Sequence, residues 1–218
     1  ANIKQSFLQT MKSNIIQFRN FDIHVSKDVF SPRDDIDIYQ KIFKNLIRDD
    51  KEFDLLELGT GSGFISVAIA KEYKNVNITA TDISLDALQN AKENSERNNV
   101  NINIKFIESS WFSSLENKKY NIIVSNPPYL SKKNSKYYQN LNDPDISLYS
   151  KENGLFDIFS IMLESKSYLK QNSYLILEHS HNQTLFMKSF SSQCGLQYIY
   201  SEKDVMGFNR ISVYSNFI

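Results

Sequence analysis

The sequence predicts an α/β fold: a seven-stranded, mostly parallel sheet with helices on both faces. From residue 53 onward, short apolar runs that suit buried strands alternate with longer segments of helical spacing. A glycine-rich turn joins the first run to the first helical segment, as is typical of sheets that bind ligands at their carboxyl edge. The last two runs follow each other without a helix between them, which predicts an antiparallel terminal strand.

Residues 1–50 are expected to lead into this sheet. Residues 4–18 predict a weakly amphipathic helix, and residues 21–25 and 28–31 predict a short β-hairpin. Apolar residues at helical spacing then predict a second helix at Ile36, Tyr39, Ile42, Phe43 and Ile47. Residues 51–218 are expected to form the main domain.

The elements of the main domain follow from the same periodicities. Strands are predicted at 53–58, 76–81, 102–107, 120–125, 173–178, 196–201 and 210–214, and helices at 64–73, 84–98, 155–169 and 184–191. Residues 129–152 are expected to form a loop, which is long for a compact domain.

Length and composition exclude several classes of protein. The chain has 218 residues, 41% of them hydrophobic, which is enough to bury a core. Its 25 basic residues balance its 25 acidic ones, which argues against a large nucleic-acid surface. The single cysteine, Cys194, excludes a disulfide framework. No apolar run reaches the roughly 20 residues of a membrane span. We therefore expect a cytoplasmic protein without a membrane partner, or one of an organelle matrix if a targeting segment was removed.

Three closely spaced glycines, Gly59, Gly61 and Gly63, mark the first strand-to-helix turn. The chain has only six glycines, so this cluster indicates a backbone that turns sharply or approaches a ligand. Amides at the start of the next helix can donate to an anion. The G-x-G-x-G spacing matches neither the dinucleotide nor the P-loop fingerprint, so on its own it also suits a plain structural turn.

Polar and aromatic residues follow the next two predicted strands. Asp82 can accept hydrogen bonds from both hydroxyls of a ribose, or it can cap the following helix. Trp111 can stack on a purine while Ser110 bonds to the edge of the base, although Trp111 suits a core position equally well. The glycine turn and Asp82 together favour a nucleoside-containing cofactor.

The fourth strand ends in Asn126, Pro127, Pro128 and Tyr129. Two consecutive prolines cannot belong to a central strand, so they fix a bend at the edge where such sheets bind ligands. The Asn126 side-chain oxygen and the Pro127 carbonyl match the two hydrogens of a planar NH2 group, and the Tyr129 ring can stack on a flat amide or base. Because the nitrogen of such a group is a poor nucleophile, aimed acceptors and alignment predict methyl transfer from a sulfonium to nitrogen.

These motifs resemble those of the Rossmann-like class I S-adenosylmethionine-dependent methyltransferases with an NPPY motif, and above all the HemK/PrmC protein-glutamine methyltransferases. The resemblance covers about residue 18 to the C-terminus. Its segments are 21–37, 57–63, 111–112, 126–129, 143–154, 177–179 and 207–210, together with Asp82. It implies that residues 51–218 form the methyltransferase domain and that the acceptor is a glutamine of a peptide chain release factor.

The resemblance also implies roles for individual residues. Those implied to hold S-adenosylmethionine are Glu57, Gly59, Thr60, Gly61, Gly63, Asp82, Ile83, Ser110, Trp111 and Asn126. The glutamine amide would be held by Asn126, Pro127, Pro128 and Tyr129, with Asn126, Pro127 and Tyr129 acting in catalysis. Ser110 and Asp145 depart from the aspartate and arginine usual in the family. About 17 residues precede the match, so we expect the helical N-terminal domain of the family to be largely absent.

Other functions remain open at this point. Adenine in RNA or DNA also offers a planar NH2 group, although the neutral net charge counts against it. A small-molecule N-methyltransferase and a non-catalytic binding subunit are further alternatives. No metal is expected, because Asp34, Asp35 and Asp37 suit a solvated helix start and no ligating residue accompanies His179 and His181 in their motif.

Overall fold

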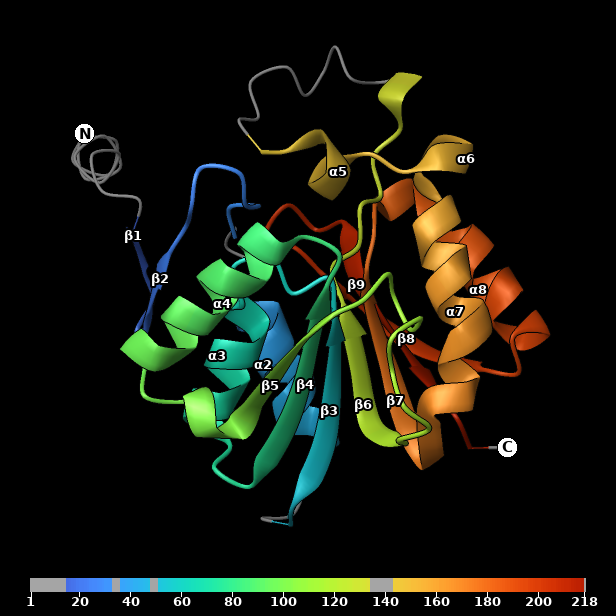
Figure 1. Cartoon of the computed structure of the whole chain (residues 1–218). Coiled ribbons are helices and arrows are strands. Elements are labelled where there is room, and N and C mark those ends of the chain that lie inside the picture. Colours follow the sequence, from blue (N-terminus) through green and yellow to red (C-terminus); the bar gives the residue numbers. More distant parts are fainter. Residues whose placement is uncertain (1–14, 33–35, 48–50, 134–142, 218) are drawn as a thin grey trace.

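A seven-stranded sheet forms the centre of the molecule in the computed structural model, which describes residues 15–32, 36–47, 51–133 and 143–217 (Figure 1). Its strand order is β5-β4-β3-β6-β7-β9-β8. The strands are β3 (Phe53–Leu58), β4 (Val76–Asp82), β5 (Ile104–Glu108), β6 (Tyr120–Ser125), β7 (Leu169–Glu178), β8 (Gln197–Lys203) and β9 (Asn209–Ser215). The strands from β5 to β7 pair in parallel, and β9 runs antiparallel to both of its neighbours. The predicted fold class, with its antiparallel terminal strand, is confirmed.

Helices cover both faces of this sheet (Figure 1). One face carries α2 (Ile36–Leu46), α3 (Phe64–Glu72) and α4 (Leu85–Arg97), and the other carries α7 (Phe156–Tyr168) and α8 (Thr184–Gln193). The shorter elements are α5 (Asp145–Leu148), α6 (Lys151–Gly154) and two 3₁₀ helices, Asn101–Asn103 and His181–Gln183. Helices α5 and α6 lie beyond the carboxyl ends of the parallel strands, where they border the candidate site.

Strand β3 shows how the sequence builds two cores. Successive side chains of a strand point to opposite faces. Leu55 accordingly belongs to the apolar cluster on the α3 face, whereas Leu56 and Leu58 belong to the cluster on the α7 face. All three are fully buried, as expected for a central strand of a parallel sheet. The same alternation directs Glu57 toward α3, where a buried carboxylate needs hydrogen-bond donors.

The first hairpin differs from the prediction. Strand β1 (Ile15–Gln17) pairs antiparallel with β2 (Asp22–His24), and residues 28–31 form no strand but follow a turn at residues 27 and 28 as irregular backbone. The expectation of a helix through residue 18 is therefore wrong at residues 15–17, and residues 4–14 lie outside the described residues. Short segments rich in isoleucine fit either periodicity, and here the pairing with β2 selects the strand.

Three asparagines on one face of α4 complete the other edge of β2. The pairs are Asn98 with Asp22, Asn94 with His24, and Asn90 with His24 and Ser26. Each side chain accepts a hydrogen bond from a backbone N–H within residues 22–26 and donates one to a carbonyl of β2. The asparagines, four residues apart on α4, face alternate residues of the β2 segment because the two spacings are similar. Four helical residues rise about 6 Å, and two strand residues span roughly 6.7 Å. The amides thus satisfy backbone groups that would otherwise lie open at an edge.

The set of Asn90, Asn94 and Asn98, here called the asparagine ladder, also fixes the segment that follows β2. The Asn94 amide also donates to the Ser62 carbonyl (2.9 Å), which ties β2 to the glycine turn. At the far end, the Ser31 N–H donates to Asp143 Oδ1 (2.8 Å). Residues 25–32 are therefore held at both ends beside the glycine turn, and they form one wall of the cavity described below.

The ladder makes a prediction for stability. Asn94→Ala removes a fully buried amide that bonds to the His24 N–H, the His24 carbonyl and the Ser62 carbonyl. We expect the free energy of unfolding to fall by about 2–3 kcal/mol, because several backbone groups lose their partners. Urea denaturation followed by circular dichroism measures this. Glu93→Ala, at an exposed position of the same helix, should change the value by less than about 0.5 kcal/mol, and an equal loss in both variants would contradict the role of the ladder.

Candidate active site

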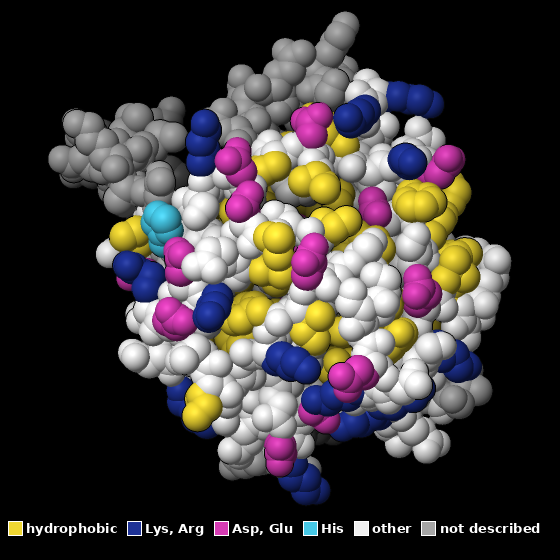
Figure 2. All heavy atoms as spheres, in the orientation of Figure 1, with side chains coloured by type: hydrophobic (Ala, Val, Ile, Leu, Met, Phe, Trp, Pro, Cys, Tyr) yellow, Lys and Arg dark blue, Asp and Glu magenta, His cyan; other side chains and the backbone are white. Residues whose placement is uncertain are grey.

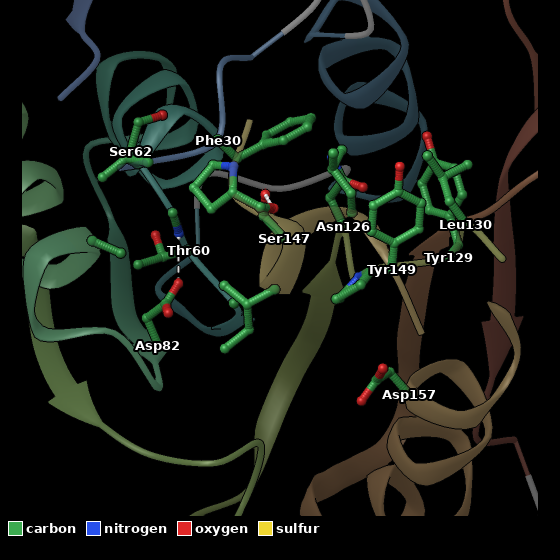
Figure 3. A pocket seen from close by; sticks show the side chains of 18 of the residues that line it. Phe30, Thr60, Ser62, Asp82, Asn126, Tyr129, Leu130, Ser147, Tyr149 and Asp157 are labelled. Atoms are coloured by element: carbon green, nitrogen blue, oxygen red, sulfur yellow. Dashed lines mark hydrogen bonds between the residues drawn. The ribbon is translucent and has the colours of Figure 1, made fainter. Parts of the chain in front are cut away.

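A cavity of about 1050 Å³ lies at the carboxyl ends of the parallel strands. Figure 3 shows Thr60 and Asp82 on one side of it, and Asn126, Tyr129 and Tyr149 on the other. The predicted site residues that line it are Glu57, Gly59, Thr60, Gly61, Asp82, Ile83, Ser110, Trp111, Asn126, Pro128 and Tyr129. Gly63 and Pro127 are not part of its lining. The fold thus brings the two groups of predicted residues into one cavity.

The three glycines of the turn meet different requirements. All have positive φ angles of 55° to 78°, a conformation that L side chains rarely adopt. Gly63 precedes α3, and a Cβ there would lie 2.9 Å from Ala91 Cβ of α4. Gly59 faces the Trp111 ring, whereas a Cβ on Gly61 would meet nothing within 4 Å. Gly63 therefore serves the packing of two helices, and Gly59 and Gly61 face the cavity.

Asp82 ends β4 and organises the glycine turn. The Gly61 N–H donates to its Oδ2 (2.9 Å), and the Ser84 N–H donates to its Oδ1 (2.9 Å). Ser84 is itself the N-cap of α4, because its side chain accepts a hydrogen bond from the Ala87 N–H. Burial raises the pKa of Asp82, and the backbone N–H groups of Ser84, Gly61 and Ile83 oppose this. Each carboxylate oxygen keeps lone-pair capacity for a ligand hydroxyl in addition to its backbone bond.

Glu57 stabilises the glycine turn through buried hydrogen bonds. It is 1% exposed, and its Oε2 accepts hydrogen bonds from the Thr60 hydroxyl (2.8 Å), the Ser66 N–H (3.2 Å) and the Ser66 hydroxyl. Burial raises the pKa of Glu57 to about 7, although the bonds from Ser66 and Thr60 favour the ionised form. The carboxylate therefore joins β3, the turn and the first turn of α3, in addition to bordering the cavity.

Trp111 takes an unusual backbone conformation. Its φ is 51°, which is rare for a residue other than glycine. The Ser109 hydroxyl donates to the Trp111 carbonyl (2.9 Å) and accepts a hydrogen bond from the Ser114 N–H (3.0 Å), so the turn is locked around Trp111. The ring is half-buried, packs against the α7-side core and still lines the cavity. The core interpretation of Trp111 is thus confirmed in part, and stacking on a purine stays a prediction, while Ser110 is exposed and lines the cavity.

The four residues Asn126–Tyr129, here called the tetrad, begin where β6 ends. The Ser125 hydroxyl donates to the Leu58 carbonyl (2.7 Å), which joins the ends of β6 and β3 immediately before Asn126. Asn126 and Tyr129 are half-buried and face the cavity, whereas Pro127 is buried. The strand ends and the two prolines thus present Asn126 and Tyr129 from a rigid backbone.

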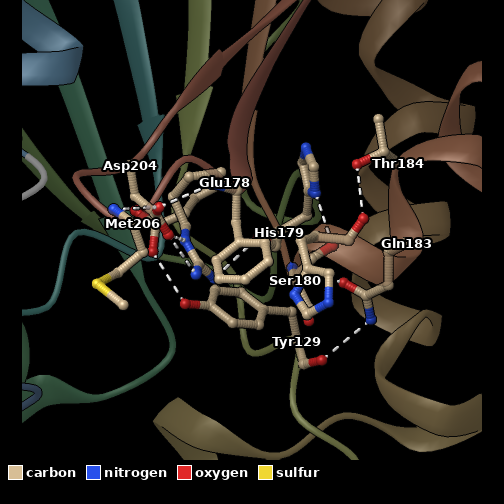
Figure 4. Close-up of polar contacts among 11 residues, drawn as sticks. Tyr129, Glu178, His179, Ser180, Gln183, Thr184, Asp204 and Met206 are labelled. Atoms are coloured by element: carbon tan, nitrogen blue, oxygen red, sulfur yellow. Dashed lines mark hydrogen bonds and ion pairs between the residues drawn. The ribbon is translucent and has the colours of Figure 1, made fainter.

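Glu178 and Gln183 hold Tyr129, and sequence reasoning assigned no role to either (Figure 4). The hydroxyls of Tyr129 (3.1 Å) and Tyr39 (3.0 Å) both donate to the buried Glu178 carboxylate. Gln183 Nε2 donates to the carbonyls of Tyr129 (3.0 Å) and Gly154 (3.1 Å). An acidic residue at the end of a buried strand was the available signal for Glu178, but the two tyrosines that donate to it lie far away in the sequence.

The backbone of α6 approaches the tetrad closely. Glu152, Asn153 and Gly154 all have positive φ angles, of 51°, 59° and 89°. A Cβ on Gly154 would lie 2.1 Å from the Tyr129 carbonyl oxygen, so only glycine fits there. Strained backbone of this kind concentrates at functional sites, where surrounding contacts maintain it.

His179 is structural. It is fully buried, and its ring nitrogens lie 2.9 Å from the Ser180 carbonyl and 2.6 Å from the Ser212 hydroxyl. Burial lowers the pKa of His179 to about 4, so the ring is neutral at neutral pH. Among the described residues, no group of three or more potential metal-binding side chains is brought together, and Asp34 and Asp35 lie outside that part of the chain. Nor does the described part contain a helix of the length and apolar character needed to cross a membrane.

Comparisons with solved structures agree with this architecture. A methyltransferase from Pyrococcus furiosus superposes with a TM-score of 0.71 at 16% identity, covering 99% of this chain and 98% of that one. The ribosomal protein L11 methylase of Lactobacillus delbrueckii gives a TM-score of 0.68 at 16% identity, covering 92% and 97%. At these identities the likeness concerns the fold alone.

Sequence comparisons identify the family in addition to the fold. The methyltransferase small domain family matches residues 20–142. A release factor glutamine methyltransferase of Francisella tularensis is 34% identical over 196 residues, covering 88% of this chain and 69% of the relative. One of Buchnera aphidicola is 35% identical over 199 residues, covering 90% and 71%. A bifunctional methyltransferase of Rickettsia prowazekii is 38% identical over 164 residues, covering 74% of this chain but only 32% of the relative. This chain therefore belongs to the methyltransferase small domain family and, within it, to the release factor glutamine methyltransferases.

Proposed function

We propose that this protein transfers a methyl group from S-adenosylmethionine to the side-chain amide nitrogen of a glutamine in a peptide chain release factor. The observation that carries the proposal is that Asn126, Pro128 and Tyr129 of the tetrad line the same cavity as Asp82, Gly59 and Gly61. The names of the relatives that this chain matches over most of its length supply the class of acceptor.

The donor set at the glycine end fits S-adenosylmethionine. Asp82 offers two carboxylate oxygens to the ribose hydroxyls, and its bond to the Gly61 N–H holds the turn open beside them. The apolar ring of Trp111 lines the same cavity as Asp82 and would suit the adenine, with Ser110 next to it in the chain. Bound S-adenosylmethionine supplies a methyl group on a positively charged sulfur, which activates that methyl for transfer.

The tetrad fits the acceptor. The Asn126 side-chain oxygen and the Pro127 carbonyl would accept hydrogen bonds from the two N–H groups of the glutamine amide, which orients its nitrogen and enriches it in electron density. The Tyr129 ring would stack on the flat amide, with its hydroxyl held by Glu178. Alignment of this kind reduces the entropic part of the barrier, so a strong general base is not required.

The surface favours a protein acceptor over a nucleic acid. Basic and acidic side chains are interspersed over the face seen in Figure 2, and on the described part of that face they form no broad basic field. A nucleic acid substrate would need several phosphate contacts from lysine or arginine. A polypeptide loop makes no such demand.

The direct test is incubation with labelled S-adenosylmethionine and either a release factor or bulk RNA. We expect label in the release factor, at a glutamine identified by digestion and mass spectrometry. Asn126→Ala protein under the same conditions serves as the blank. Label found only in RNA would contradict the proposed acceptor and leave the adenine methyltransferase alternative in its place.

The Glu178 contacts predict a specific effect on turnover. Glu178→Ala removes the acceptor for the Tyr129 hydroxyl, so the ring loses its fixed orientation, and we expect kcat to fall by about tenfold while the affinity for S-adenosylmethionine stays within about twofold. Tyr39→Phe removes the hydrogen bond from the Tyr39 hydroxyl to the same carboxylate and leaves Tyr129 in place. Steady-state kinetics should therefore show near-normal kcat for Tyr39→Phe, and equal losses in both variants would mean that Glu178 serves stability alone.

A further inference from the structure

The turn between β8 and β9 presents apolar side chains at the rim of the cavity. Val205 is 94% exposed, Met206 is 76% exposed and Phe208 is 47% exposed. All three line the same cavity as Asn126 and Tyr129. Figure 4 shows Met206 and Asp204 on the side toward which the Tyr129 hydroxyl points. Large apolar side chains gathered at the mouth of a binding cavity mark a contact surface.

The turn is held rigidly in this position by Asp204. Its Oδ1 accepts hydrogen bonds from the N–H groups of Met206 (2.9 Å) and Phe208 (3.0 Å). Its Oδ2 accepts hydrogen bonds from Arg210 Nη2 (2.8 Å) and Nε (3.2 Å). Two backbone bonds, Asp204 N–H to the Phe208 carbonyl and Gly207 N–H to the Asp204 carbonyl, close the turn. The exposure of Val205 and Met206 therefore does not come from a loose loop, because an ordered ion pair holds the backbone that displays them.

The position of the turn also constrains what can contact it. A glutamine amide sits at the end of only two methylene groups. When the amide reaches Asn126, the main chain that bears it must therefore lie at the cavity mouth. Val205 and Met206 form part of that mouth. Arg210, near the start of β9, is already paired with Asp204, which makes it a poor contact for phosphate.

We propose that Val205 and Met206 form a contact surface for the polypeptide main chain that flanks the target glutamine. This inference rests on the proposed function and adds to it a residue pair that binds the protein substrate at the mouth of the catalytic cavity. Burial of two exposed apolar side chains supplies affinity, and the rigid turn keeps the entropic cost of ordering low. The surface should govern the binding of the release factor and leave the methyl-transfer step unchanged.

The test is the double variant V205S/M206S, with L185S/F186S as its matched control. Leu185 and Phe186 are exposed on α8 (78% and 64%) and do not line the cavity. The affinity of each variant for the release factor is measured by isothermal titration calorimetry, and KM and kcat are measured by transfer of the labelled methyl group. We expect V205S/M206S to weaken binding and raise KM by about tenfold to a hundredfold, with kcat near that of the unmodified protein. The control should match the unmodified protein in both.

Further measurements distinguish a wrong contact surface from a wrong proposed function. Melting temperature and the dissociation constant for S-adenosylmethionine should be unchanged in V205S/M206S, since both side chains are solvent-exposed. If the unmodified protein labels the release factor but V205S/M206S binds it as tightly as the control does, the contact surface is wrong and the proposed function stands. If the unmodified protein does not label the release factor, both are wrong.

Discussion

Asn126→Ala is expected to lower kcat by about 10²–10³-fold while the dissociation constant for S-adenosylmethionine changes by less than about threefold. The substitution removes one of the two acceptors proposed for the acceptor amide, and loss of one aimed hydrogen bond in a transition state has an effect of this size. The strand end should survive, because the Ser125 hydroxyl still bonds to the Leu58 carbonyl. Single-turnover kinetics measure the chemical step, and calorimetry measures cofactor binding.

The same strand offers a control for this variant. Asn121 lies at the opposite end of β6, where its side chain accepts hydrogen bonds from the Asp54 N–H (2.9 Å) and from Lys170 Nζ (2.8 Å). Asn121→Ala should lower the melting temperature yet keep kcat near normal. If Asn126→Ala loses cofactor affinity without loss of kcat, the tetrad does not act on the acceptor.

Asp82→Ala is expected to raise the dissociation constant for S-adenosylmethionine by about tenfold to a hundredfold. Two effects contribute: the carboxylate oxygens proposed for the ribose hydroxyls are lost, and the Gly61 and Ser84 N–H groups lose their acceptor. Hydrogen bonds to a charged group contribute about 1.5–3 kcal/mol each, and a factor of ten corresponds to about 1.4 kcal/mol. Binding calorimetry of the purified variant gives the value directly.

Asp86→Ala is the matched control for Asp82→Ala. Asp86 lies in the first turn of α4, is exposed and does not line the cavity, so its removal changes the net charge equally without touching the proposed ribose site. We expect its dissociation constant to stay within about twofold of the unmodified value. Equal weakening in both variants would point to a general electrostatic effect and contradict the role proposed for Asp82.

Local patterns in the sequence were sufficient for most of the sheet. Strands β3 and β6 begin and end at the predicted residues, because each is a short apolar run bounded by polar residues or turn residues. The cap of α4 at Ser84 follows from the same local chemistry. Such signals involve neighbours in the chain and therefore need no tertiary information. The predicted roles of Asp82 and the tetrad remain predictions, although Asp82, Asn126, Pro128 and Tyr129 line one cavity.

Contacts between distant segments decided what the sequence left open. The partner of β2 is β1 instead of residues 28–31, and its other edge is completed by asparagines about 70 residues away, at Asn90, Asn94 and Asn98. Asn, Asp and Glu side chains on a helix or strand end look alike in a sequence whether they face water or a backbone group. Only the packing shows which of these side chains form hydrogen bonds with the open backbone groups of a strand edge.

The sequence by itself determined the parallel α/β sheet, the glycine turn and the rigid tetrad, because periodicity and backbone restrictions of glycine and proline are properties of neighbouring residues. The tertiary structure decided that Glu178 orients Tyr129, that Gly154 must be a glycine to pass the Tyr129 carbonyl, and that Val205 and Met206 stand at the cavity rim. These features depend on hydrogen bonds and close approaches between segments that meet only after the sheet has assembled.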